Sequence, residues 1–405
     1  MVSKPIILPT NFYEGDQLEV IQELAPKNFE LIFLKEASQK ELINTISLAD
    51  YLLVGGRLQI NSEVLEHAKR LKMVQRTGAG LDNMDFHAFR KRSLPLYVNF
   101  GVNANSVAEH TIMMMLALLR NMPLVHETTK LGKWNKHGFG LASRGLKGKI
   151  VGLFGMGHIG LEVARLLQVF NVKVLYNKPN RLSSVEEKEL GISYCTFEEL
   201  LKNSDIISLH ASLNASTKHV INIESLKQMK SSSYLINTSR GQLVDEPALV
   251  EALNKRIIRG AALDVFEKEP FDASNGLFQC ENVILTPHIG GSTEEAQENI
   301  GEDVSIKLYQ YLERGVSNGS HTIPSLSLPP VDGAHRILHI HKNVPGVLGA
   351  INTLLSKNKI NIVGQYLKTN DEIGYVVLDV DSKLSKQAMT LLKEVKETIR
   401  VRMLY

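Results

Sequence analysis

Three side chains suited to moving a hydride and a proton stand in the middle of the chain. Arg240, Glu269 and His288 each come a few residues after a strand-length apolar run. In an open parallel sheet, ligands bind outside the carboxyl ends of the strands, so these side chains are expected to converge. An arginine can hold a carboxylate through two hydrogen bonds, a histidine can take a hydroxyl proton near neutral pH, and a glutamate can orient the imidazole. Together the three predict oxidation of a 2-hydroxy acid by hydride transfer, whereas each alone is as readily an ordinary surface residue.

A glycine-rich turn supplies the cofactor half of this prediction. Gly155, Gly157 and Gly160 follow the apolar run 150–154 and open a helical pattern over 161–170. In a G-x-G-x-x-G turn the first glycine bends tightly, the second lets the backbone approach a pyrophosphate, and the third packs the helix on the strand. The helix N-terminus then offers N–H groups to the anion. The spacing predicts a dinucleotide-binding domain, although a strand–helix turn without a ligand can look the same.

The residue that selects between NAD and NADP departs from the usual pattern. An Asp or Glu about 20 residues after the glycines normally binds the ribose hydroxyls. Here the strand ends in Asn177, followed by Lys178 and Arg181. Asn177 removes the charge that repels a 2′-phosphate, and the two cations could attract one. Asn177 could equally bond the ribose while the cations stay solvated, so NAD is the expected cofactor and NADP remains open.

The elements that must position these residues form an α/β chain. Short apolar runs between residues 31 and 75 alternate with helical patterns, which indicates a mostly parallel sheet. Ser106, with Glu109 three residues later, predicts a capping box at the start of a long helix. A second series of strand-length runs gives the doubly wound Rossmann pattern: 150–154, 172–176, 206–210, 233–237, 261–264 and 283–285.

A composition change separates the last part of the chain. Residues 315–333 are rich in Ser, Pro and Gly, as interdomain linkers are. The remaining residues are ordered strand, helix, strand, strand, helix, strand, which predicts a ferredoxin-like βαββαβ unit. The expected domains are a flavodoxin-like substrate-binding domain (1–102 plus 292–318), a dinucleotide-binding domain (103–291), a linker (319–334) and a C-terminal regulatory domain (335–405).

The composition excludes several other classes of protein. Lys+Arg 46 against Asp+Glu 43 gives a net charge of +3 over 405 residues, so overall charge favours neither nucleic acid nor an anionic membrane as partner. Two cysteines, Cys195 and Cys280, cannot build a disulfide scaffold or a Cys-rich zinc site, and no metal is expected. The longest apolar stretch, 111–119, is well short of the ~20 residues that span a bilayer. We expect a cytoplasmic protein.

The motifs resemble those of a known enzyme family. Four of them are similar to the signatures of the D-isomer-specific 2-hydroxyacid dehydrogenases: 155–160, 237–241, 264–269 and 287–291. Three further stretches make the chain most similar to the bacterial 3-phosphoglycerate-oxidising branch, which ends in an ACT domain: 285–301, 339–348 and 400–405. With 78–83 near the front, the likeness spans nearly the whole chain. That resemblance implies oxidation of 3-phospho-D-glycerate to 3-phosphohydroxypyruvate, the first step of L-serine biosynthesis, with 2-oxoglutarate reduction as a further activity.

The resemblance also implies roles for matching residues, in a cleft between the first two domains. Catalysis would belong to Arg240, Glu269 and His288. Substrate binding would belong to Arg57, Arg76, Asn103, Arg240 and Lys136, the last reaching from a neighbouring subunit in related enzymes. Cofactor binding would involve Gly155, Gly157, His158, Ile159, Gly160, Asn177, Lys178, His210, Thr238, Ser239, Arg240, Asp264, His288, Gly290 and Gly291, with Asp264 near the nicotinamide.

Two departures from the family pattern keep other functions open. Gly55 stands where a basic residue is common, which weakens the expected phosphate contact. Gly55 and Asn177 together favour an NADP-dependent glyoxylate or hydroxypyruvate reductase as the alternative enzyme. The same fold also serves as a dinucleotide-sensing corepressor, a binding protein with little turnover.

The C-terminal unit resembles an ACT domain, a module that binds amino acids at a helix N-terminus and dimer interface. His341, Asn343 and Asn361 match the effector-contacting positions, and the resemblance implies feedback inhibition by L-serine. Because such domains pair edge strands across subunits, a homotetramer with two kinds of dimer contact is expected.

Overall fold

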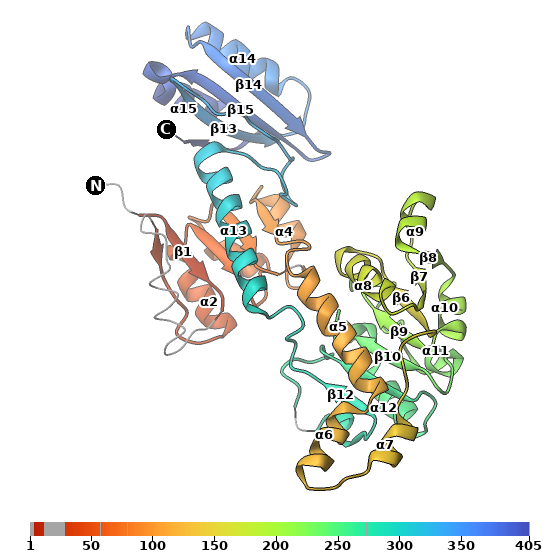
Figure 1. Cartoon of the computed structure of the whole chain (residues 1–405). Helices are drawn as coiled ribbons and strands as arrows, with labels where there is room; N and C mark the ends of the chain where they lie inside the picture. The colour runs from red at the N-terminus through yellow and green to blue at the C-terminus, as the bar shows by residue number, and fades with distance from the viewer. Residues whose placement is uncertain (1–3, 12–28, 57, 79, 273, 405) are drawn as a thin grey trace. The chain divides into compact units, whose positions relative to one another are not determined.

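The computed structural model describes residues 4–11, 29–56, 58–78, 80–272 and 274–404 (Figure 1). The chain divides into two compact units, Met1–Phe100 with Ile300–Tyr405, and Gly101–Asn299. The first unit therefore contains both the N-terminal sheet and the C-terminal sheet. The four-part division expected from the sequence stays a prediction.

The N-terminal sheet is parallel and has the order β2-β1-β3-β4-β5, which is the flavodoxin-like order. Its strands are β1 (Ile6–Pro9), β2 (Glu30–Leu31), β3 (Tyr51–Val54), β4 (Met73–Arg76) and β5 (Leu96–Val98). Three helices pack their apolar residues on one face, α2 (Gln39–Thr45), α3 (Ser62–His67) and α4 (Phe86–Lys91), each with a side chain capping its N-terminus.

The C-terminal part of the first unit has the predicted βαββαβ order. It is an antiparallel sheet of order β14-β15-β13-β16 with α14 and α15 on one face (Figure 1). The elements are β13 (Ala334–Lys342), α14 (Val347–Lys357), β14 (Ile362–Thr369), β15 (Ile373–Asp381), α15 (Ser385–Glu394) and β16 (Thr398–Met403). Apolar residues alternate along β13, so Ile337 faces the helices while Leu338 faces the rest of the first unit.

The other face of this sheet packs on α13 (Glu294–Arg314) and the N-terminal sheet in one shared core. Side chains of the C-terminal sheet also bind the carbonyls at the end of α13. Arg402 donates to Tyr311 O at 2.7 Å, Arg336 to Arg314 O at 3.0 Å, and Tyr375 to Gly315 O at 2.6 Å. The contacts to Arg314 O and Gly315 O supply partners for carbonyls at the end of the helix, while Tyr311 O also accepts the Gly315 N–H at 3.2 Å.

The Ser/Pro/Gly-rich segment before β13 is packed rather than extended as a free linker. Thr322 is buried, and its Oγ1 donates to Leu94 O at 2.6 Å and accepts from Leu96 N at 2.9 Å. Arg336 also donates to Pro329 O at 3.1 Å.

The second unit is a doubly wound parallel sheet of order β12-β11-β10-β9-β6-β7-β8. Its strands are β6 (Ile150–Phe154), β7 (Lys173–Asn177), β8 (Ile192–Tyr194), β9 (Ile206–Leu209), β10 (Tyr234–Asn237), β11 (Gly260–Leu263) and β12 (Val283–Leu285). The six predicted strands are present. The sequence prediction missed β8, a three-residue edge strand too short to show a periodic pattern.

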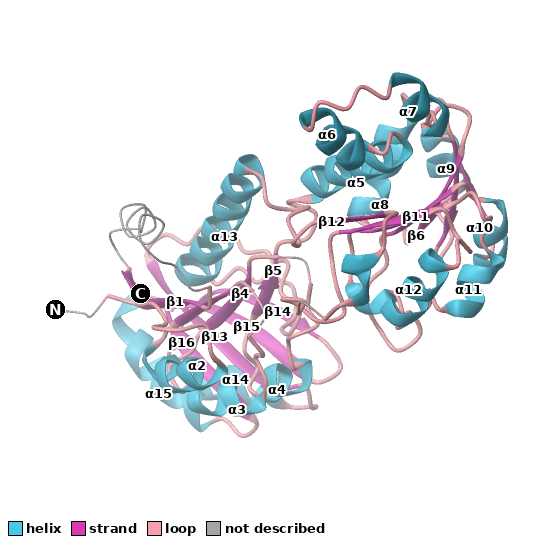
Figure 2. Ribbon diagram, turned by 90° about the horizontal axis from the view of Figure 1, so that it is seen from below, coloured by secondary structure: helices cyan, strands magenta, loops and turns pink. Residues whose placement is uncertain are grey.

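Helices cover both faces of this sheet (Figure 2). One face carries α5 (Ala104–Leu119), α8 (His158–Gln168) and α9 (Ser184–Leu190), and the other carries α10 (Phe197–Asn203), α11 (Ile223–Gln228) and α12 (Glu246–Asn254). The helical pair α6 (Met122–Lys130) and α7 (Lys136–Ala142) has no buried residue among its described side chains. Within the described ranges, no helix combines the length and apolarity needed to cross a membrane.

The predicted capping box at Ser106 is wrong. The helix begins at Ala104, with Asn103 as its N-cap. Ser106 lies inside the first turns, and its Oγ is 3.0 Å from Thr293 Oγ1. A tertiary hydrogen bond therefore uses the hydroxyl that the local pattern assigned to capping.

Candidate active site

The glycine-rich turn between β6 and α8 has the shape that a dinucleotide needs. Gly155 has φ +99°, and a Cβ there would lie 2.5 Å from the backbone of His210. A Cβ on Gly160 would collide with the Gly155 carbonyl oxygen, so α8 sits tightly on the turn. On Gly157, the N-cap of α8, a Cβ would meet no atom of the described residues within 4 Å. This open side borders the helix N–H groups, so the turn fits a pyrophosphate.

The end of β7 holds the residues expected beside the adenosine ribose. Asn177 donates from Nδ2 to Cys195 O at 2.9 Å, and within the described part of the chain its Oδ1 accepts no hydrogen bond. Arg181 donates from Nε and Nη2 to both carboxylate oxygens of Glu187, at 2.8 and 2.7 Å. This pair lowers the pKa of Glu187 to about 2 and occupies the Arg181 fork. Lys178 is half-buried and forms no ion pair with the described residues.

His210, Thr238 and Ser239 follow the carboxyl ends of β9 and β10. Burial lowers the pKa of His210 to about 3, so its ring is neutral. Its Nε2 lies 2.9 Å from Ser208 Oγ, while its Nδ1 is buried without a hydrogen-bond partner among the described residues. Ser239 donates from Oγ to Ala211 O at 2.7 Å. An unpaired buried nitrogen next to the glycine turn is consistent with a site completed by a ligand.

The three predicted catalytic residues follow three neighbouring strands, β10, β11 and β12. His288 donates from Nδ1 to Glu269 Oε2 at 2.8 Å, and Glu269 Oε1 accepts the Phe266 N–H at 3.0 Å. The His288 side chain is 46% exposed and that of Glu269 is 15% exposed, so the ring is accessible while the carboxylate is fixed. Arg240 donates from Nη1 to Ser239 O at 2.6 Å.

Asp264 holds the turn that carries His288. It is buried, and its Oδ1 accepts from Thr286 Oγ1 at 2.6 Å and from Ile289 N at 2.9 Å, while its Oδ2 accepts from Gly290 N at 2.8 Å. Burial alone would raise the pKa of Asp264, but these hydrogen bonds, with one from His110, hold it below its ordinary value. The expected contact of Asp264 with the nicotinamide stays a prediction.

Gly291 and Asn103 meet at the end of the same turn. A Cβ on Gly291 would collide with Asn103 Nδ2, so the absent side chain makes room for the amide. The structure therefore brings Asn103 to the His288 turn. Lys136 is the exposed first residue of α7, and among the described residues it makes no hydrogen bond or ion pair with this group.

In the first unit, the predicted substrate-binding residue Arg76 is the last residue of β4. Arg76 donates from Nε to Gly80 O at 2.9 Å and from Nη1 to Val54 O at 3.0 Å. Its guanidinium thus ties the end of β3 to the loop after β4. Arg57 falls outside the described residues.

Asn11 fills the space beside Gly55, the position where a basic residue is common in the family. A Cβ on Gly55 would collide with the Asn11 amide. Thr10 fixes Gly55 from the other side, because its Oγ1 donates to Gly55 O at 2.8 Å and accepts from Gly55 N at 3.1 Å. The amide at this place is uncharged, so it supplies no cation there.

The predicted effector residues lie at two ends of the C-terminal sheet. His341 is buried with its Nδ1 unpartnered among the described residues, and Asn343 donates from Nδ2 to Asn370 O at 2.7 Å. Asn361 precedes β14 and pairs with Asp381, at the opposite end. One chain therefore brings together His341 and Asn343 but not Asn361.

Sequence reasoning missed three residues that hold these loops. Thr286 stands directly before the Pro287–His288 motif, and that position could have indicated that it holds the His288 turn. Glu246 accepts from Glu267 N at 2.6 Å and so holds the loop that leads to Glu269. His110 reaches the site from α5, and nothing local in the sequence distinguishes it from a core residue.

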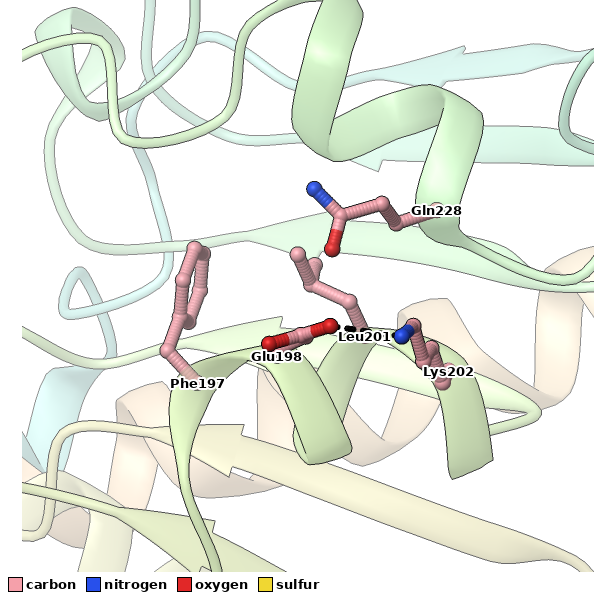
Figure 3. A pocket seen from close by; sticks show the side chains of 5 residues that line it. All are labelled: Phe197, Glu198, Leu201, Lys202 and Gln228. Atoms are coloured by element: carbon pink, nitrogen blue, oxygen red, sulfur yellow. Dashed lines mark hydrogen bonds and ion pairs between the residues drawn. The ribbon is translucent and has the colours of Figure 1, made fainter.

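A pocket of about 450 Å³ lies between α10 and α11 (Figure 3). Its side chains are Phe197, Glu198, Leu201, Lys202 and Gln228, with an ion pair between Glu198 and Lys202. It contains none of the predicted site residues, and its lining offers no group suited to the chemistry above.

Family models match two parts of the chain. The model described as the D-isomer specific 2-hydroxyacid dehydrogenase, NAD binding domain, matches residues 112–290. The model described as the AHAS small subunit-like ACT domain matches residues 337–402. These ranges contain the glycine turn with its catalytic loops and the βαββαβ unit.

Relatives match over most of their length. The D-3-phosphoglycerate dehydrogenase of Haemophilus influenzae is 37% identical over 378 residues, which covers 92% of this chain and 91% of that protein. The protein of the same name from Escherichia coli is 36% identical over 401 residues, 97% and 96% of the two chains. Among solved structures, the NAD-dependent formate dehydrogenase from Staphylococcus aureus in complex with NAD aligns with a TM-score of 0.67 at 29% identity, covering 76% of this chain and 95% of that one.

Proposed function

The chain belongs to the D-isomer-specific 2-hydroxyacid dehydrogenase family, and from that premise we propose that it oxidises 3-phospho-D-glycerate to 3-phosphohydroxypyruvate. It is an NAD(P)-dependent oxidoreductase with an ACT domain. The observation that carries the reaction is the 2.8 Å contact between His288 Nδ1 and Glu269 Oε2 at the carboxyl edge of the Rossmann sheet. The choice of substrate is supported by the names of relatives that match along nearly the whole chain.

The side chains supply proton transfer and orientation. A bound nicotinamide would supply the acceptor for the hydride that leaves C2. Because His288 Nδ1 donates to a carboxylate, its Nε2 is the nitrogen that accepts the hydroxyl proton. Glu269 then stabilises the imidazolium, and the Phe266 N–H keeps the carboxylate in place. Arg240 holds the carboxylate of the substrate or the oxygen at C2.

NAD is the proposed cofactor. Asn177 Oδ1 is available to accept a ribose hydroxyl, while its Nδ2 is used by Cys195. Glu187 occupies Arg181, which leaves Lys178 as the cation nearest in sequence to a 2′-phosphate. A single lysine gives a weaker phosphate site than a pair of cations, so NADP should be the poorer substrate.

The phosphate of the substrate is proposed to contact Arg57, Arg76 and, from a second subunit, Lys136. At Gly55, where a basic residue is common in the family, the neutral Asn11 amide fills the space instead. This observation favours a second candidate, reduction of glyoxylate or hydroxypyruvate, because those acids carry no phosphate.

L-Serine is the proposed effector, bound between two ACT domains. In β14 the outer edge is not paired within the described chain, and two such edges can pair antiparallel across subunits. That pairing moves Asn361 of one chain towards the end of the sheet where the other chain holds His341 and Asn343. Open space around Gly346 and Gly349 leaves the N-terminus of α14 accessible to a carboxylate.

A second subunit contact is proposed at the α6–α7 hairpin, which would complete a homotetramer. Leu131, Trp134 and Leu141 are 71%, 84% and 83% exposed in the single chain. Such a patch on helices without a buried face is expected to pack on a second copy. The same hairpin carries Lys136, so this contact would deliver that lysine to a neighbour. Light scattering should give four times the chain mass of 45.1 kDa.

Initial rates test the function. The purified chain is assayed with 3-phosphohydroxypyruvate, hydroxypyruvate, glyoxylate and 2-oxoglutarate, each with NADH and NADPH, with and without L-serine. The proposal expects the highest kcat/KM for 3-phosphohydroxypyruvate with NADH, and inhibition by serine. A preference for hydroxypyruvate or glyoxylate with NADPH would favour the second candidate, and nucleotide binding without turnover would favour a sensing protein.

A further inference from the structure

The backbone at His288 has to be held in an unfavourable conformation. His288 has φ +59°, in the left-handed region that side chains other than glycine rarely adopt. Within the turn itself, the His288 N–H is bonded only to the nearby Thr286 O at 3.0 Å. Residues outside the turn must therefore stabilise it, or the ring will leave the position in which it can take a proton.

Asp264 and Thr286 provide that support as a small buried network. Asp264 accepts from the N–H groups of Ile289 and Gly290, the two residues directly after His288. Thr286, two residues before it, donates its hydroxyl to the same carboxylate at 2.6 Å. The carboxylate thus ties both sides of the turn together.

His110 is the side chain from outside the sheet that joins this network. Its Nε2 lies 3.2 Å from Thr286 Oγ1 and 3.5 Å from Asp264 Oδ1, and its side chain is 11% exposed. Because the Thr286 proton is used on Asp264, the Thr286 oxygen accepts and His110 Nε2 donates. A Cβ on Gly290 would lie 3.4 Å from His110 Cδ2, so the ring also packs on the turn.

The neighbouring residue on α5 binds the next catalytic loop. Thr111 Oγ1 lies 2.9 Å from Thr238 Oγ1, two residues before Arg240. Consecutive residues of α5 thus contact the loops of both His288 and Arg240.

We infer that His110 is a positioning residue, which donates to Thr286 and Asp264 and so holds the His288 turn in its reactive conformation. The inference rests on the proposed role of His288 as the base. His110 reaches the His288 turn through Thr286 and Asp264, so its effect is on geometry rather than on proton transfer. Its removal should therefore slow turnover and leave substrate and cofactor binding nearly unchanged.

The test compares His110→Ala, His110→Gln and the control Met113→Gln in the full chain. Met113 lies one turn further along α5 and is 50% exposed. A misplaced reacting group typically costs ten- to a hundredfold, so His110→Ala should lower kcat by about tenfold with both KM values within about twofold. His110→Gln keeps an N–H donor and should recover most of kcat, while Met113→Gln should match wild type. A Thr286→Val/His110→Ala double variant should lose less than the product of the single losses, because both act on one network.

Three results overturn the inference. Full kcat in His110→Ala removes the role. Parallel changes in kcat, both KM values and melting temperature, without recovery in His110→Gln, make His110 a general structural residue. Losses that multiply in the double variant separate His110 from the Asp264 network. His288→Ala is measured beside them: if it keeps wild-type turnover, the proposed base fails and the inference with it, whereas an inactive His288→Ala with a fully active His110→Ala refutes His110 alone.

Discussion

Glu269→Gln should impair oxidation more than Glu269→Ala, although glutamine is the closer match in shape. The reason lies in the partner of the other carboxylate oxygen. The Phe266 N–H donates to Glu269 Oε1 at 3.0 Å, and a glutamine must keep its carbonyl oxygen there. Its NH₂ group then faces His288 Nδ1, which stands 2.8 Å from Oε2 in the native chain. His288 Nδ1 must then accept a hydrogen bond from this NH₂ group, so the ring proton moves to Nε2. A protonated Nε2 can no longer take the hydroxyl proton of the substrate.

The magnitude follows from two losses. A charged hydrogen bond contributes about 1.5–3 kcal/mol, and the lower end applies because the His288 side chain is 46% exposed. Losing about 1.5 kcal/mol lowers kcat roughly tenfold, which is the expected effect of Glu269→Ala. In Glu269→Gln, His288 could keep its tautomer only if the amide flipped. The glutamine NH₂ would then face the Phe266 N–H, two donors without an acceptor, at a cost of about 1–3 kcal/mol. The wrong tautomer therefore adds about ten- to a hundredfold, for a total of about 100- to 1,000-fold.

The assay is kcat for NADH formation from the best 2-hydroxy acid, measured for wild type, Glu269→Ala, Glu269→Gln and Glu267→Gln. Glu267 is the matched control, because it undergoes the same chemical change two residues earlier and contacts His219 instead. It should stay within about twofold of wild type. A Glu269→Gln enzyme as active as Glu269→Ala, or more active, would refute the tautomer reasoning.

Three further predictions concern the cofactor site and the stability of the first unit. Asn177→Asp should lower kcat/KM for NADP relative to NAD by about tenfold, since a carboxylate repels the 2′-phosphate; an unchanged ratio would mean that this side chain does not read the ribose. Arg336→Met should destabilise the chain by about 3–5 kcal/mol in urea, because it leaves Asp379 buried without the guanidinium that binds both its oxygens at 2.7 and 2.8 Å; Arg336→Met/Asp379→Leu should recover part of this, since it removes the buried charge but not the loss of a donor to Arg314 O and Pro329 O. Burial, with the nearby His341, lowers the pKa of His339 from 6.5 to about 4, so only the unfolded chain binds its proton in that window. Stability should therefore fall as pH drops from about 6.5 to 4, by up to about 3 kcal/mol, and His339→Gln should flatten this slope; an identical slope would exclude His339 as its source.

Much of the fold follows from patterns that neighbouring residues carry. The turn at Gly155, Gly157 and Gly160 could be predicted because the local backbone geometry of such a turn requires glycine at these positions. The structure has the expected strand, turn and helix. The βαββαβ order was readable for the same reason, since strand and helix periods repeat within a few residues. The prediction at Ser106 was wrong because a capping box is only one use of a hydroxyl, and a distant Thr293 offered another.

The residue types of the candidate site could be predicted from the sequence, but the side chains that hold them in place could not. Arg240, Glu269 and His288 could be grouped from sequence because parallel strands end at one edge of a sheet. Local patterns did not reveal that Asn11 would cover Gly55, or that Glu187 would occupy Arg181. These pairings depend on which side chains the packed chain brings within hydrogen-bond reach.

The sequence by itself predicted the fold class, the glycine-rich turn and the types of side chain that we propose for the chemistry, because those patterns depend on neighbours along the chain. Only the tertiary structure decided which side chains hold the site residues in position. Asp264 became the anchor of the His288 turn, and His110 joined it from a helix more than a hundred residues away in sequence. A hydrogen bond needs its two atoms about 3 Å apart, and for residues so distant in sequence that distance is set by packing alone.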